Sequence, residues 1–235
     1  MSDLRTSTWS IAAADGSGAF DAHVAWPEGP GPHPAVVIVQ EIFGVNANIR
    51  AVAQTYAQAG FVAVALDLFW RLQAGVDLGY SEAERGQAFA LMQRFDAEAG
   101  VADIQSTIDR VRHDAACTGR VGVVGFCLGG KMAYLSACAT DADASVGYYA
   151  VGLERLLDRA EHIQRPLVLH IAEQDALCPP EAREAILAAL ADQPQVTCHV
   201  YPDVGHAFAR VNGDHWAPQA AELANARTLA LLRSL

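Results

Sequence analysis

The sequence lacks the features of several large classes of protein. Its five cysteines form no Cys-X-X-Cys pair and are odd in number, so neither a disulfide framework nor a zinc cluster is indicated. Aromatic residues make up only 8% of the chain, and no apolar run reaches the roughly 18 residues typical of a transmembrane helix. The first ten residues contain no apolar core of the kind found in signal peptides. We therefore expect a cytoplasmic protein whose cysteines are free thiols.

Positive charge is also scarce. The chain has 16 lysines and arginines against 27 aspartates and glutamates, which gives a formal net charge of −11. This balance argues against nucleic acid and anionic membranes as partners, because both require a basic surface. A small anionic ligand remains compatible, since a few arginines in one pocket can outweigh a distant negative surface that salt screens.

What the sequence does contain is a regular alternation of apolar strands and helical patterns. Hydrophobic residues make up 52% of the 235 residues, enough for a substantial core. Strands are expected at 20–26, 35–39, 61–66, 121–125, 145–149, 167–171 and 196–201. Helices are expected at 48–59, 82–94, 101–114, 128–139, 180–191 and 219–232. The alternation predicts a mostly parallel sheet flanked by helices, and we expect residues 1–235 to form a single α/β domain.

The most informative segment follows the strand expected at 121–125. Residues 125–129 read Gly-Phe-Cys-Leu-Gly, the pattern of a nucleophile elbow with cysteine in place of the usual serine. The glycines are needed because larger side chains would collide with backbone in so tight a turn. Cys127 would then stand at the start of a helix, where backbone N–H groups stabilise a thiolate and an oxyanion. The alternative is a buried structural cysteine in a glycine-rich turn.

An acid and a histidine follow Cys127 at the positions that such a fold requires. Asp175 lies in the loop after the strand expected at 167–171, and His206 lies in the loop after the strand expected at 196–201. Nucleophile, acid and histidine in this chain order, each at the carboxyl end of a strand, form the arrangement of α/β-hydrolases. We therefore predict the α/β-hydrolase fold and a catalytic triad of Cys127, Asp175 and His206.

The other titratable residues are less informative. His170 interrupts an apolar strand and is expected to be a satisfied core residue, while histidines such as His215 have no partner at a recognisable spacing. No histidine pair has the i, i+4 spacing of a helical metal site, so no metal is implied. Glu41 follows the strand expected at 35–39, near the fold's second oxyanion donor. A buried carboxylate there would need a partner, and a surface carboxylate at a strand end is the alternative.

Several motifs resemble those of the dienelactone hydrolase (carboxymethylenebutenolidase) family. They are Gln-Glu-Ile-Phe-Gly-Val-Asn at 40–46, Val-Val-Gly-Phe-Cys-Leu-Gly-Gly at 123–130, Gly-Tyr-Tyr at 147–149 with Val-Gly-Leu-Glu at 151–154, and Gly-His-Ala-Phe-Ala-Arg at 205–210. The resemblance runs from about residue 20 to the C-terminus. It implies the same triad, and it implies that Glu41 holds the thiol in check and accepts its proton when the anionic substrate arrives.

The resemblance also implies groups that bind the substrate. Backbone N–H groups of Ile42 and Leu128 would form the oxyanion hole. Arg85 and Arg210 would clamp the substrate carboxylate, a task for which the planar guanidinium is suited because it can bind both oxygens at once.

The activity that the resemblance implies is the opening of an enol-lactone, dienelactone (4-carboxymethylenebut-2-en-4-olide), to maleylacetate in chloroaromatic and aromatic catabolism. A monomer without a cofactor is expected. Phe89 and Met92 stand where the family's best-known members carry tyrosine and tryptophan, so they bear on the isomer or the class of lactone accepted. The alternatives are a carboxylesterase or thioesterase of the same fold and, more distantly, a binding module without catalysis.

Overall fold

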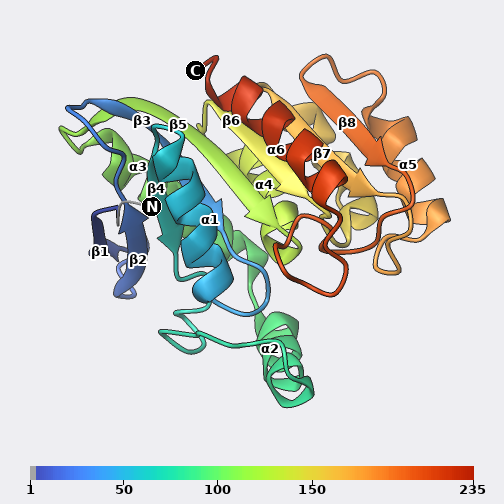
Figure 1. The fold of residues 1–235 in the computed structure, drawn as a ribbon, viewed down its shortest axis with the longest axis horizontal. Coiled ribbons are helices and arrows are strands. Elements are labelled where there is room, and N and C mark those ends of the chain that lie inside the picture. Colours follow the sequence, from blue (N-terminus) through green and yellow to red (C-terminus); the bar gives the residue numbers. More distant parts are fainter. Residues whose placement is uncertain (1–3) are drawn as a thin grey trace. The chain divides into compact units, whose positions relative to one another are not determined.

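The strands expected from the sequence are all present in the computed structural model, which describes residues 4–235. The chain divides into two units, Met1–Gly122 and Val123–Leu235, and its organisation as one domain therefore stays a prediction. Strand β5 (Cys117–Phe126) begins in the first unit and ends in the second. In each unit strands are accompanied by helices, as the alternation in the sequence predicts (Figure 1).

The strands of the first unit are neighbours in the order β1 (Thr6–Ala12), β2 (Ala19–Ala25), β4 (Val62–Leu66) and β3 (His33–Val39). Strands β3 and β4 are parallel, whereas β2 is antiparallel to both β1 and β4. The sequence did not predict β1, because its residues are mostly small, polar and exposed. Its pairing with β2 is what makes this segment a strand.

Three helices belong to the first unit: α1 (Ala47–Gln58), α2 (Glu82–Arg94) and α3 (Ala97–Arg112). The side chain of Asn46 accepts a hydrogen bond from the Ile49 N–H (3.2 Å) and so caps α1. Its amide donates to the Leu78 carbonyl (2.9 Å), which ties the segment after β3 to the loop before α2. Helix α2 opens with a capping box between Ser81 and Glu84, and it projects away from the strands of its unit (Figure 1).

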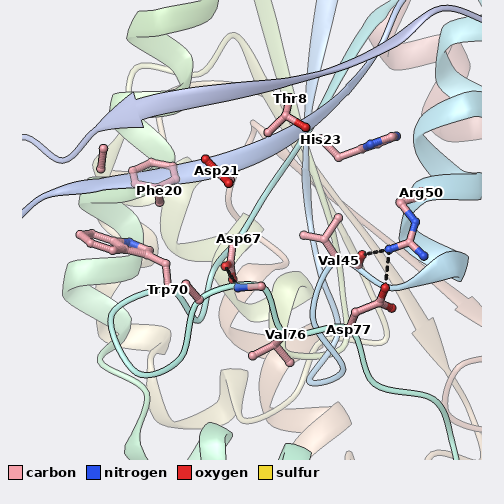
Figure 2. A pocket seen from close by; sticks show the side chains of 13 residues that line it. Thr8, Phe20, Asp21, His23, Val45, Arg50, Asp67, Trp70, Val76 and Asp77 are labelled. Carbon is pink, nitrogen blue, oxygen red and sulfur yellow. Dashed lines mark hydrogen bonds and ion pairs between the residues drawn. The ribbon is translucent and has the colours of Figure 1, made fainter.

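A pocket of about 390 Å³ opens in the first unit, between β2, α1 and the loop after β4. Figure 2 shows the Phe20 and Trp70 rings on one side of it and the Arg50–Asp77 ion pair on another. Asp67 is buried and accepts hydrogen bonds from the N–H groups of Gly75 (2.7 Å) and Phe69 (3.1 Å), so it holds the loop in place. Burial raises the pKa of this carboxyl. The pocket contains none of the residues predicted for the catalytic site.

The strands of the second unit follow β5 in the order β6 (Ala144–Tyr148), β7 (Leu167–Ala172) and β8 (Val196–Tyr201), and these three are parallel. Because parallel strands end at the same edge, the loops that follow them are brought together there. The helices are α4 (Leu128–Ala139), α5 (Pro180–Leu190) and α6 (Pro218–Leu232), with short 3-10 helices at Leu153–Arg155 and Leu157–His162. Helix α6 crosses in front of β6 and β7 in Figure 1. Within residues 4–235, no helix is long and apolar enough to cross a bilayer.

A buried carboxylate links α3 to the loop after β4. Asp103 is 1% exposed and accepts hydrogen bonds from the Trp70 indole (2.7 Å) and from two nitrogens of Arg71 (2.9 and 2.8 Å). Arg71 also donates to Asp15 (2.8 Å), which lies in the turn between β1 and β2. Three segments distant in sequence therefore converge on one guanidinium.

We predict that Asp103→Ala lowers the free energy of unfolding by about 3 kcal/mol, because it removes the buried acceptor of two Arg71 nitrogens and of the Trp70 indole N–H. Denaturant unfolding followed by circular dichroism measures this. Asp15→Ala is the matched control, since that partner is exposed and an exposed pair contributes at most about 1 kcal/mol. Equal losses in the two variants would contradict the assignment.

Candidate active site

Cys127 occupies the tight turn between β5 and α4, as the elbow pattern predicts. Its backbone has φ 56° and ψ −112°, a conformation that is strained for a residue with a side chain. A Cβ atom at Gly125 would lie 1.8 Å from the Gly129 carbonyl oxygen, so only glycine fits there. The Cys127 N–H donates to the Tyr148 carbonyl at the end of β6 (3.0 Å), which fixes the turn against the neighbouring strand.

His206 and Asp175 lie together at the same edge of the second unit. His206 Nδ1 is 2.7 Å from Asp175 Oδ2, with the two side chains 18% and 1% exposed. The other carboxylate oxygen of Asp175 accepts from the Leu177 N–H (2.8 Å), so the carboxylate is held in one orientation. Both residues occupy the loops in which the sequence placed them.

Two opposing influences act on the pKa of the His206 imidazole. Burial lowers its pKa, but hydrogen bonds with Asp175 and Cys127, together with the charges of these two groups, raise the pKa to about 10. The net shift links the three predicted triad residues electrostatically. It favours the imidazolium form of His206 at neutral pH.

Tyr149 is a site residue to which the sequence analysis assigned no role. Its ring meets the His206 ring edge to face, with centroids 5.1 Å apart, and it also contacts the Phe208 ring. Its backbone has φ 37°, and its N–H donates to the His170 carbonyl (2.8 Å). The only signal in the sequence is its place in the Gly-Tyr-Tyr motif after β6, because the contact with His206 depends on the folded chain.

His170 is a satisfied core residue, as predicted. It is fully buried, and its two ring nitrogens lie 2.9 Å from the Thr228 hydroxyl and 2.8 Å from the Tyr201 hydroxyl. Burial lowers its pKa to about 3, so the ring is neutral. His215 has no partner at a recognisable spacing in the sequence, and in the fold its Nδ1 lies 3.0 Å from the His206 carbonyl oxygen. The spacing rules for helices and metal sites do not cover such a loop contact.

Leu128, which is expected to be an oxyanion donor, lies at the N-terminus of α4. Cys127 is the N-cap residue, and its side chain makes no capping hydrogen bond. Leu128 is the first residue of the helix and is buried. Backbone N–H groups of a first helical turn have no carbonyl partner within the helix, so they are suited to bind developing negative charge.

The remaining residues expected at the site lie on three segments. Arg210 follows His206 in the loop before α6 and is half-buried. In the first unit, Glu41 and Ile42 lie after Gln40 in the segment that leaves β3, and they are 3% and 5% exposed. Glu41 is therefore not the surface carboxylate of the alternative interpretation. Helix α2 carries the rest: an exposed Arg85, Phe89 at 45% exposure and a half-buried Met92. Within residues 4–235, no group of three histidine, cysteine or acidic side chains is arranged to hold a metal ion.

A parallel sheet flanked by helices, with an elbow after one strand and an acid and a histidine after two later ones, defines the class of α/β-hydrolases. The model of the dienelactone hydrolase family matches residues 20–235. The chain therefore belongs to the dienelactone hydrolase family. This confirms the predicted family and fold class, and it confirms the predicted class of enzyme, a hydrolase of carboxylic esters of the lactone type.

Individual relatives agree with this assignment. A carboxymethylenebutenolidase of Pseudomonas putida is 40% identical over 227 residues, covering 96% of this chain and 95% of that protein. A provisionally named carboxymethylenebutenolidase of Azospirillum brasilense is 46% identical over 231 residues, covering 95% and 96%. Among solved structures, a provisionally named dienelactone hydrolase of Klebsiella pneumoniae superposes with a TM-score of 0.83 at 26% identity, covering 98% of this chain and all of that one.

The raised pKa of His206 makes a prediction about pH. Because the folded-state pKa of about 10 lies above the ordinary 6.5, the imidazolium stabilises the fold fully below pH 6.5, and this contribution is lost as pH rises through about 10. Cys127→Ala removes one hydrogen bond and one negative charge, so the His206 pKa should fall. NMR titration of the imidazole measures the change, with Cys138→Ala as the control. An unchanged pKa in Cys127→Ala would contradict the coupling.

Proposed function

We propose that this enzyme opens a carboxylate-bearing enol-lactone, dienelactone, to maleylacetate with Cys127 as the nucleophile, in the catabolism of chloroaromatic and other aromatic compounds. The observation that carries the proposal is the His206–Asp175 contact of 2.7 Å together with the hydrogen bond and charge that link His206 to Cys127. The relatives from Pseudomonas putida and Azospirillum brasilense support the choice of substrate, since both are named as carboxymethylenebutenolidases.

In the first step, the Cys127 thiolate adds to the lactone carbonyl carbon. The negative charge that develops on the carbonyl oxygen is stabilised by the N–H groups of Leu128 and Ile42. When the carbonyl re-forms, the ring C–O bond breaks and the ring oxygen leaves as an enolate. The product of this step is a thioester between Cys127 and the opened substrate.

The second step needs a base, and acylation converts His206 into one by lowering its pKa. Before acylation, the hydrogen bond with Cys127 and the charge of its thiolate contribute to the raised pKa of His206. A thioester carries no charge on sulfur, so these contributions disappear and the pKa of His206 falls. The imidazolium gives its proton to the departing enolate, and the neutral imidazole then takes a proton from the attacking water, while Asp175 holds the ring in place. Release of the thiolate, which takes its proton back from Glu41, restores the starting state.

The chemistry of the leaving group explains why a thiol suffices. An enolate is a much better leaving group than an amide nitrogen, so ring opening needs little help from a general acid. A peptide bond would need such help, and a peptidase is correspondingly disfavoured.

Substrate recognition is proposed for Arg85 and Arg210, which would bind the carboxylate, with Phe89 and Met92 forming part of the wall. Glu41 would accept the thiol proton when that carboxylate arrives. A buried glutamate is suited to this because its charge state responds strongly to a neighbouring anion.

Cys127→Ala should abolish turnover, with a loss of at least about a thousandfold in kcat, because no other group can form the thioester. The assay follows hydrolysis of dienelactone isomers through the loss of their ultraviolet absorbance. Cys138→Ala, which removes a thiol on α4 away from the turn, should retain full activity. Appreciable hydrolysis by Cys127→Ala would contradict the assignment of the nucleophile.

Arg210→Ala should raise KM about tenfold or more for a lactone with a free carboxylate and change KM little for a neutral ester, since a charge-assisted pair is lost only with the former. Initial rates on both substrates measure the difference. If KM rises equally for both, the arginine supports the loop and binds no carboxylate.

The exposed Phe89 and the flexible Met92 favour a second candidate, a carboxylesterase or thioesterase of the same fold. A panel of enol-lactones, simple esters and thioesters distinguishes the two by kcat/KM. The non-catalytic alternative is tested by alkylation, because a binding module would show Cys127 reacting no faster than the other four cysteines.

A further inference from the structure

The side chain of Arg210 lies directly across Gly213. A Cβ atom at Gly213 would stand 2.7 Å from Arg210 Nε, 3.1 Å from the Arg210 carbonyl oxygen and 3.5 Å from Arg210 Cβ. Gly213 is not among the residues with positive φ, so its backbone conformation is open to alanine. Glycine is required here because the Arg210 side chain occupies the space that a side chain at position 213 would take.

The backbone around the two residues is fixed by a series of turns. The Arg210 N–H donates to the Ala207 carbonyl (2.9 Å), the Gly213 N–H to the Arg210 carbonyl (3.0 Å) and the Trp216 N–H to the Gly213 carbonyl (3.0 Å). The Ala217 N–H then returns to the Phe208 carbonyl (2.9 Å), which closes the loop. A methyl group at position 213 would therefore require displacement of the Arg210 side chain at 2.7 Å, whereas the 3.1 Å contact with the Arg210 carbonyl oxygen requires only a small adjustment of the backbone.

We propose that Gly213 is a positioning residue that sets the direction of the Arg210 guanidinium and thereby the selectivity for carboxylate-bearing substrates. The inference rests on the proposed role of Arg210. Ordinary van der Waals contact begins near 3.4 Å, so a methyl group at 2.7 Å must push Nε away by several tenths of an ångström. Two parallel hydrogen bonds to one carboxylate depend on the plane of the guanidinium, and a displaced plane loses at least one of them.

The test is a double-mutant cycle of Gly213→Ala and Arg210→Ala, with kcat and KM measured for dienelactone and for a neutral ester. Gly213→Ala should raise KM for dienelactone about tenfold, leave its kcat within about twofold and leave the neutral ester unchanged. In the Arg210→Ala background the same substitution should have no further effect, because the group that it displaces is gone.

Each outcome bears on one of the two claims. If Arg210→Ala discriminates between the substrates and Gly213→Ala does not, the positioning role is wrong and the proposed clamp stands. If Arg210→Ala itself fails to discriminate, the clamp is wrong and the positioning role falls with it. A change in KM that persists in the Arg210→Ala background would also overturn the inference. Concentrations are set by titration of the reactive thiol, so that partial unfolding of Gly213→Ala does not alter the constants, and a crystal structure of that variant should show the guanidinium displaced.

Discussion

The close approach between Gly125 and the Gly129 carbonyl is the constraint on which the rest of the second unit's edge depends. With 1.8 Å between that oxygen and any added Cβ, the chain can turn from β5 into α4 only through glycine. The turn forces Cys127 to φ 56° and directs its N–H to the carbonyl of Tyr148. The next link is Tyr149, whose N–H reaches the His170 carbonyl on β7 and whose ring packs on His206. The requirement for glycine at position 125 is thus connected to the position of His206 through backbone hydrogen bonds and the Tyr149 ring.

Such strain persists only where the surroundings over-determine the backbone. Three non-glycine residues around the proposed site, Cys127, Tyr149 and Ala207, have positive φ. Behind them, His170 is held between the hydroxyl groups of Tyr201 and Thr228 in a neutral, fully buried state. A neutral histidine with both nitrogens occupied is a rigid support and adds no competing charge near the proposed imidazolium. The charges that raise the pKa of His206 are therefore those of Asp175 and Cys127.

Much of this architecture could be predicted because its signals are local. The bounds of α2 and α4 agree with the predicted ranges 82–94 and 128–139, the first predicted from its helical pattern and the start of the second from the elbow. Helix α3 begins at Ala97, earlier than the expected 101, because Asp96 caps a polar first turn that apolar periodicity does not reveal. Strand β1 and the role of Tyr149 depend on contacts with distant segments. The arginine at 210 could be read from its motif, but its contact with Gly213 exists only in the folded loop.

Some residues of the proposed site are buried and others are exposed, and this determines which of them can be substituted without loss of stability. Cys127, Asp175 and the glycines of the elbow are packed so closely that a substitution there costs folding free energy as well as chemistry. Phe89 is 45% exposed on a helix that projects from its strands, and Arg210 lies in a loop. Substitutions at an exposed position such as Phe89 cost little stability. The proposed reaction therefore depends on residues that also stabilise the fold. Under the proposal for Arg210 and Gly213, a single methyl group at position 213 would alter selectivity through the Arg210 side chain, the nearest group to it.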